Sequence, residues 1–252
     1  VCVDWKALVD VIDALGGLDL DLTKEEVHWV NGYITETANS IGYPCDALKG
    51  EGRVHLNGVQ AVSYSRIRYT SGDDFLRASR QRIVLQAILE KCKGEDIATL
   101  TSMCSSMMDD ISTNFTVKEI LALAKNVTKY QISSTTGFPY NVATKELSGV
   151  GDTVIPIDLA TDVVQLHKYL FEDESYTVSD TVQSISDTVQ KKTDVDSKTD
   201  IYDTTKYNNT AGSTGTEGAK KKNKDAQDAL KKSQSESEND STTKSSSDDS
   251  DD

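Results

Sequence analysis

The chain has 252 residues, of which 37% are hydrophobic and 27% charged, and its formal net charge is −14. This acidity argues against nucleic acid as a partner, because nucleic-acid-binding domains normally carry an excess of positive charge. No segment approaches the ~18 apolar residues that a membrane-spanning helix needs.

Composition divides the chain near residue 172. Residues 1–172 carry regularly spaced apolar side chains, whereas residues 173–252 are rich in Ser, Asp, Glu and Lys. A segment with so few large apolar residues buries too little surface to offset the entropy lost on ordering. We therefore predict one folded domain at 1–172 and a disordered acidic tail at 173–252.

Short strands and helices alternate at the start of the folded part. Asp4 is placed to cap a helix that Gly16 and Gly17 end. Thr23 and Glu26 form a capping-box pattern at the start of a longer helix. The predicted elements are a strand end at 1–3, a helix at 4–15, a strand at 18–22, a helix at 24–41, a strand at 53–56 and a helix at 59–64.

Helices dominate the second half of the folded part. The apolar spacing predicts helices at 77–91, 97–111, 117–127 and 158–171, and strands at 130–134 and 153–157. The alternation along the whole segment predicts an α/β or α+β fold with a central sheet.

Five of the six arginines lie between residues 66 and 82, namely Arg66, Arg68, Arg77, Arg80 and Arg82. The planar guanidinium fork matches phosphate oxygens two at a time. Like charges at this density repel each other unless an anion compensates them. The cluster indicates a site for a phosphorylated ligand; the alternative is a solvated basic helix with ordinary surface ion pairs.

The spacing of these residues suggests two groups that converge. If the residues around 66 and 68 are extended, Arg66 and Arg68 project from the same side. On the following helix, Arg77 and Gln81 share one face and Arg80 lies beside them.

A turn-forming stretch at 70–74 separates the two groups and could fold one back toward the other. Arg82 lies on a flank of the predicted helix. Asp73 or Asp74 could cap this helix, orient an arginine or hold a divalent ion.

The remaining reactive side chains give no second motif. The cysteines lack the spacing of a metal site with the histidines. We expect buried free thiols, or one disulfide if the protein is exported. The four cysteines are Cys2, Cys45, Cys92 and Cys104.

The arginine segment carries a family signature. It reads LNGVQAVSYSRIR at 56–68, DFLR at 74–77 and RQR at 80–82. These motifs closely resemble the LytR–CpsA–Psr pattern, roughly LNGxxALxYxRxR, DFGR and RQR. VDWKALVDVIDALGGLDLDL at 3–22 is similar to the helix–GG–strand unit of the same family. The resemblance covers residues 1–172, and Leu76 stands where the family usually has Gly.

The resemblance implies a bacterial cell-envelope phosphotransferase. Such enzymes move a glycopolymer, such as wall teichoic acid or capsular polysaccharide, from a polyprenyl-pyrophosphate carrier to a muramic-acid hydroxyl of peptidoglycan. It also implies a mixed sheet flanked by helices around an apolar lipid tunnel, assistance by Mg²⁺, and an extracellular domain held by an N-terminal membrane anchor, as in a Gram-positive wall.

The resemblance assigns roles to individual residues. It places one set against the pyrophosphate: Arg66, Arg68, Arg77, Gln81 and Arg82. Arg80 matches a basic position of the same set less closely. Asp74 would orient an arginine or act near the proton transfer. The family's first strands, anchor and metal-binding residues are expected before residue 1, so the Mg²⁺ ligands cannot be named here.

Two alternatives follow if those upstream residues are missing. The chain could be a non-catalytic binder of polyprenyl phosphates or of an anionic wall polymer. It could also be a nonfunctional remnant, which would expose a sheet edge and an apolar core and be poorly soluble.

Overall fold

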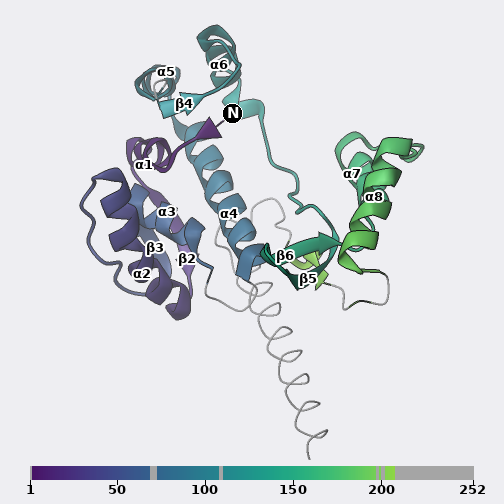
Figure 1. Ribbon diagram of the computed structural model, residues 1–252. Coiled ribbons are helices and arrows are strands. Elements are labelled where there is room, and N and C mark those ends of the chain that lie inside the picture. Colours follow the sequence, from purple (N-terminus) through teal and green to yellow (C-terminus); the bar gives the residue numbers. More distant parts are fainter. Residues whose placement is uncertain (1, 69–72, 108–109, 197–198, 200–201, 208–252) are drawn as a thin grey trace, which may run out of the picture. The chain divides into compact units, whose positions relative to one another are not determined.

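The computed structural model describes residues 2–68, 73–107, 110–196, 199 and 202–207, without the side chains of residues 73, 74, 202, 206 and 207 (Figure 1). The described chain divides into two compact units, with the boundary between Thr135 and Thr136. Each unit is considered by itself. None of the helices in these ranges combines the length and the apolar character that crossing a membrane requires.

The first unit begins with the elements that local sequence signals predict. Asp4 accepts a hydrogen bond from the Ala7 backbone N–H at 2.8 Å, and Thr23 and Glu26 form a complete capping box. The elements are β1 (Cys2–Val3), α1 (Trp5–Ala14), β2 (Leu18–Leu22), α2 (Lys24–Ile41), β3 (Gly52–Leu56), α3 (Gly58–Arg66), α4 (Asp73–Gly94), α5 (Ile97–Ser106), β4 (Ile111–Ser112), α6 (Val117–Ala124) and η2 (Val127–Lys129).

Helix α3 lies at the centre of this unit and contacts α1, α2 and α4 (Figure 1). Strands β2 and β3 pair antiparallel, with Leu18 opposite Leu56. The alternation of β2 buries Leu18, Leu20 and Leu22 in the same core cluster as the apolar side of α3. The arginine segment therefore leaves the core directly from its central helix.

Three local predictions differ from the structure. Residues 64–66 belong to α3 and are not extended. Helix α5 ends at Ser106, and Ile111 instead pairs with Val3 in a β1–β4 ladder. Residues 130–134 form no strand within the part of the chain that is described, apart from an isolated bridge at Ser134. Short apolar runs suit either helix or strand, so only their distant partners decide between them.

The mixed α/β class is confirmed, but the sheets are small. The described strands form two two-stranded sheets and one three-stranded sheet, and every pairing is antiparallel. The predicted single central sheet is not present among the described residues.

The second unit contains one predicted strand, one predicted helix and several elements that were not predicted. Strands β5 and β6 form an antiparallel hairpin, and β7 pairs with β5. The elements are β5 (Asn141–Leu147), β6 (Gly151–Pro156), α7 (Leu159–Phe171), α8 (Asp180–Thr193), β7 (Tyr202–Asp203) and η3 (Thr204–Tyr207).

Helix α8 lies inside the predicted disordered tail, so that prediction is wrong for residues 180–193. The helix docks through a buried hydroxyl: Ser186 Oγ donates to Asp158 Oδ1 at 3.2 Å and accepts from the Ala160 N–H at 3.3 Å. Just beyond α8, Val195 is buried with Ile155 of β6. Composition hides this helix because most of its residues are polar. Residues 208–252 of the predicted tail lie outside the described residues.

One carboxyl of the second unit is buried. Asp162 on α7 is 1% exposed, and its Oδ2 has no hydrogen-bond partner in the described parts of the chain. Burial raises the pKa of Asp162 to about 6 from its ordinary 3.8, although the backbone N–H groups of Asn141 and Tyr140 favour the charged form. Folding therefore favours the protonated carboxyl.

We expect Asp162→Asn to flatten the pH dependence of stability. In the native protein the contribution of Asp162 is fully present below pH 3.8 and is lost as pH rises through about 6. Between pH ~4 and pH ~8 the variant should lose about 2–3 kcal/mol less free energy of unfolding than the native chain. Urea unfolding at several pH values, with hydrogen exchange of α7 amides, measures this. The control is Asp152→Asn, which removes an exposed carboxyl on β6. If stability changes with pH to the same extent in both variants, the buried Asp162 carboxyl is not the cause of the pH dependence.

Candidate anion-binding site

The structure places the predicted site residues on two helix ends. Arg66 is the last residue of α3, and Arg68 follows it, exposed, after the buried Ile67. Arg77 and Gln81 lie one turn apart in the first half of α4. The predicted turn between the two groups falls largely on residues 69–72, which are outside the described residues.

Arg66 is held firmly against α2. Its Nη1 donates to Thr37 Oγ1 at 2.7 Å, and its Nη2 donates to Glu36 Oε1, also at 2.7 Å. The guanidinium carbon lies 3.9 Å from the Trp5 ring centroid and 5.3 Å from that of Tyr33. The Arg66 side chain is only 14% exposed. Two hydrogen bonds and a stacked ring therefore fix its direction, and Glu36 compensates its charge.

Arg80 lies on the buried side of α4, whereas its neighbour Gln81 is exposed and Arg77 is half-buried. Arg80 is 1% exposed, and its Nε donates to Glu26 Oε1 at 3.1 Å. Burial also raises the pKa of Tyr64, whose ring lies 5.9 Å from the Arg80 guanidinium. Glu26 is itself buried, and this explains why an arginine is drawn into the core. We therefore leave Arg80 out of the proposed phosphate-binding set.

Arg80 also links the end of α3 to α4. Its Nη1 donates to the Ile67 carbonyl at 3.4 Å, and Ile67 is fully buried. The backbone just before Arg68 is thus hydrogen-bonded to the helix that carries Arg77 and Gln81. The convergence of the two groups of side chains stays a prediction.

The other predicted residues are less completely placed. Gln81 is exposed, and Arg77 and Arg82 are half-buried on α4. Asp74 belongs to the first turn of α4, but its side chain lies outside the described residues. Its predicted role stays a prediction.

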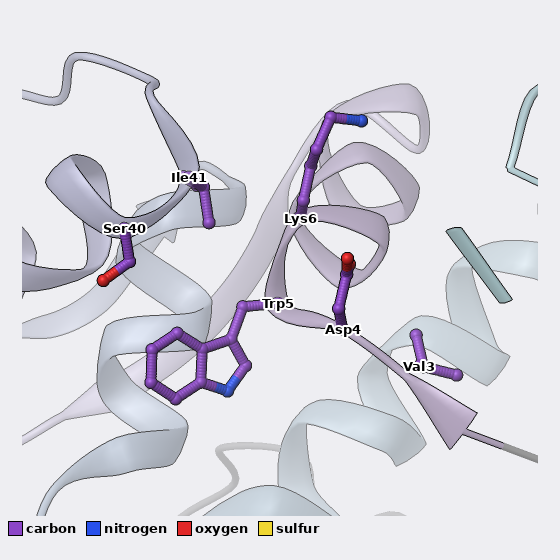
Figure 2. Close-up of a pocket in the computed structure, with 6 residues that line it drawn as sticks. All are labelled: Val3, Asp4, Trp5, Lys6, Ser40 and Ile41. Atoms are coloured by element: carbon purple, nitrogen blue, oxygen red, sulfur yellow. The ribbon is translucent and has the colours of Figure 1, made fainter. Parts of the chain in front are cut away.

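Trp5, which stacks with Arg66, also lines a cavity of about 420 Å³. The lining comes from the end of β1, the cap and first turn of α1, and the last turn of α2 (Figure 2). The lining residues are Val3, Asp4, Trp5, Lys6, Ser40 and Ile41. Sequence reasoning missed Trp5, because a lone aromatic residue after a helix cap is usually a packing residue. Its partner Arg66 is distant in the sequence.

Metal and thiol chemistry find little support among the described residues. No three His, Cys, Asp or Glu side chains there gather in a way that could hold a metal ion. The cysteines are all free thiols, and Cys2 is exposed whereas the other three are half-buried. Burial raises the pKa of the Cys92 and Cys104 thiols, which disfavours the reactive thiolate.

Fold and site together define a mixed α/β domain that presents arginines at the junction of α3 and α4. The LytR_cpsA_psr family model matches residues 1–164, so the chain belongs to the LytR–CpsA–Psr family.

Two curated relatives are both named as teichoic acid transferases. The TagU protein of Bacillus mycoides (strain KBAB4), a polyisoprenyl-teichoic acid–peptidoglycan teichoic acid transferase, is 30% identical over 128 residues, which cover 49% of this chain and 36% of TagU. TagV of Bacillus subtilis (strain 168), named as the same kind of transferase, is 27% identical over 125 residues, 49% of this chain and 30% of TagV. The chain therefore spans about a third of the length of these relatives.

Solved structures of the same group are similar at lower identity. The crystal structure of B. subtilis TagV is 24% identical, with a TM-score of 0.45, over 70% of this chain and 63% of that chain. The structure titled TagT bound to LI-WTA is 20% identical, with a TM-score of 0.45, over 69% of this chain and 59% of that chain.

Proposed function

We propose that this chain transfers a polyprenyl-pyrophosphate-linked glycopolymer, of the teichoic acid or capsular polysaccharide type, to peptidoglycan. The observation that carries the proposal is the hydrogen bond from Arg80 to the Ile67 carbonyl, which joins the chain just before Arg68 to the helix that carries Arg77 and Gln81. The names of TagU and TagV support it, because both describe teichoic acid transfer to peptidoglycan.

The chemistry assigns a task to each side chain. An acceptor hydroxyl attacks the phosphorus that carries the glycan, a new P–O bond forms, and polyprenyl phosphate leaves. Negative charge builds on the transferred and leaving phosphates, and positioned guanidinium groups stabilise it. Arg68 approaches from the end of α3, and Arg77 and Gln81 approach from α4, with Arg82 on the flank.

The proton of the acceptor hydroxyl must also leave. Asp74 stays the sequence-based candidate for accepting this proton or for orienting an arginine. Mg²⁺, implied by the family resemblance, has no ligand cluster within the described ranges, so we assign no step to it. The proposed place of action is the outer face of the cell membrane of a Gram-positive bacterium; the Bacillus sources of the relatives support this.

A transfer assay tests the proposal. The whole chain is incubated with a lipid-linked teichoic acid precursor and peptidoglycan oligomers, with and without Mg²⁺, and released polyprenyl phosphate is measured. We expect release coupled to polymer attachment, and a fall of about 10²–10³-fold in Arg68→Ala or Arg77→Ala, because each removes a charge-stabilising donor.

Two results would contradict this function. Arg68→Ala and Arg77→Ala with undiminished rates would remove these residues from the site. Binding of the lipid precursor without any release of polyprenyl phosphate would replace the transferase with a non-catalytic binder.

A further inference from the structure

The cavity beside Trp5 has no role in the arginine chemistry described above. We infer that it is a sugar subsite, which takes one pyranose ring of the glycan substrate. This inference rests on the proposed function, because the donor and the acceptor of the proposed transfer both carry sugars.

The size and position of the cavity suit a single sugar. Its volume of about 420 Å³ falls within the usual ~300–1,000 Å³ of small-ligand pockets. It opens between the first turn of α1 and the last turn of α2 (Figure 2). Trp5 lines the cavity and stacks with Arg66, so the cavity adjoins the arginine segment directly.

Trp5 supplies a platform for the apolar face of a pyranose. The side chain is 42% exposed, and the Arg66 guanidinium carbon lies 3.9 Å from its ring centroid. Thr37 and Glu36 in turn hold Arg66. Arg66 covers one face of the indole and helps to fix its position. The opposite face, which is also electron-rich, can receive the C–H groups of a sugar ring at little ordering cost.

The charges of the lining argue for a neutral ligand over a phosphate. Lys6 is the cation of the cavity, and its ammonium is bound by Asp10 at 2.8 Å and by Asp110 at 2.9 Å. Figure 2 shows the Lys6 amine turned away from Trp5. These contacts raise the pKa of Lys6, so the group stays charged and compensated.

The remaining polar groups suit hydroxyls. Asp4 contributes a carboxylate that accepts one backbone N–H, and it has further lone pairs. Ser40 Oγ donates to the Glu36 carbonyl at 2.9 Å and can still accept. Ile41 adds an apolar wall. An aromatic platform, an aliphatic wall and a few acceptors match a polyhydroxylated ring with one apolar face.

Binding measurements on the whole chain test the inference. The two probes are a phosphate-free N-acetylhexosamine disaccharide of the peptidoglycan type and a nucleoside-diphosphate N-acetylhexosamine, followed by saturation-transfer NMR. We expect Trp5→Ala to weaken the binding of at least one of the two probes tenfold or more. Trp5→Phe should retain part of that affinity. Phe115→Ala, which removes a ring of similar exposure (46%), should leave binding unchanged.

The two probes also separate the sources of the sugar. Binding of the phosphate-free disaccharide assigns the cavity to the acceptor glycan, whereas Trp5-dependent binding of the sugar diphosphate alone assigns it to the donor. The inference is wrong if the native chain binds neither probe. It is also wrong if the native chain and Trp5→Ala bind the probes equally well. Arg77→Ala should lose transfer and keep disaccharide binding, so the two proposals can fail independently.

Discussion

Arg80→Ala should lower the free energy of unfolding by about 3–5 kcal/mol. The substitution leaves the Glu26 carboxylate, 4% exposed, in the core without its cation. It also removes the donor to the Ile67 carbonyl, a bond that fixes the chain before Arg68. Urea unfolding followed by circular dichroism measures the loss. Because the pair is buried, added salt should change the result little.

Two controls separate the buried charge from general damage. Lys93→Ala removes the ion pair between Lys93 and Glu90 on the same helix, where the Glu90 side chain is half exposed. This loss should change the free energy of unfolding by less than ~1 kcal/mol. The double variant Glu26→Met/Arg80→Met should recover most of the loss, because apolar side chains of similar volume remove both charges. A loss below 1 kcal/mol in Arg80→Ala would contradict the structural role given to this arginine.

Gly58→Ala should destabilise the chain by about 2–3 kcal/mol through overpacking. A Cβ at this position would lie 2.4 Å from the Val9 carbonyl oxygen and 2.8 Å from Val9 Cα. Both are backbone atoms of α1, so they cannot move aside as a side chain would. The Gly58 N–H also donates to Asp13 Oδ1 at 2.6 Å, which ties α3 to α1 at the same place.

Gly32→Ala is the matched control for this substitution. Gly32 lies within α2, and no atom stands within 4 Å of its added Cβ. Alanine should raise stability there by about 0.5–1 kcal/mol, because it restricts the unfolded chain and favours helix. Equal effects at both glycines would show that α1 and α3 do not approach as closely as described.

Local signals predicted the start of the fold well. The Asp4 cap, the Thr23–Glu26 capping box and the alternation of β2 act within a few residues, so the sequence shows them directly. The mixed α/β class followed from the order of the predicted helices and strands along the chain. The sheets could not be predicted in the same way, because each ladder depends on a partner far along the chain, as with Val3 and Ile111.

The candidate site was likewise predicted only where the signals are local in the sequence. The spaced motifs identified the arginine segment and the family. The burial of Arg80 escaped prediction, because its partner Glu26 lies 54 residues earlier and helical spacing alone put Arg80 beside Gln81. The capture of Arg66 by Thr37 and Trp5 depends on two other helices. Helix α8 was missed because most of its residues are polar, and its one buried residue is Ser186.

One measurement tests the central claim, that arginines at the junction of α3 and α4 act on the pyrophosphate of a lipid-linked glycopolymer. It is the rate of polyprenyl phosphate release by Arg77→Ala beside Arg53→Ala, at a saturating concentration of lipid-linked donor. Arg53 lies on β3, is exposed and carries the same charge, so its loss controls for net charge. The account predicts a fall of about 10²–10³-fold for Arg77→Ala alone. Equal rates in the two variants would contradict it.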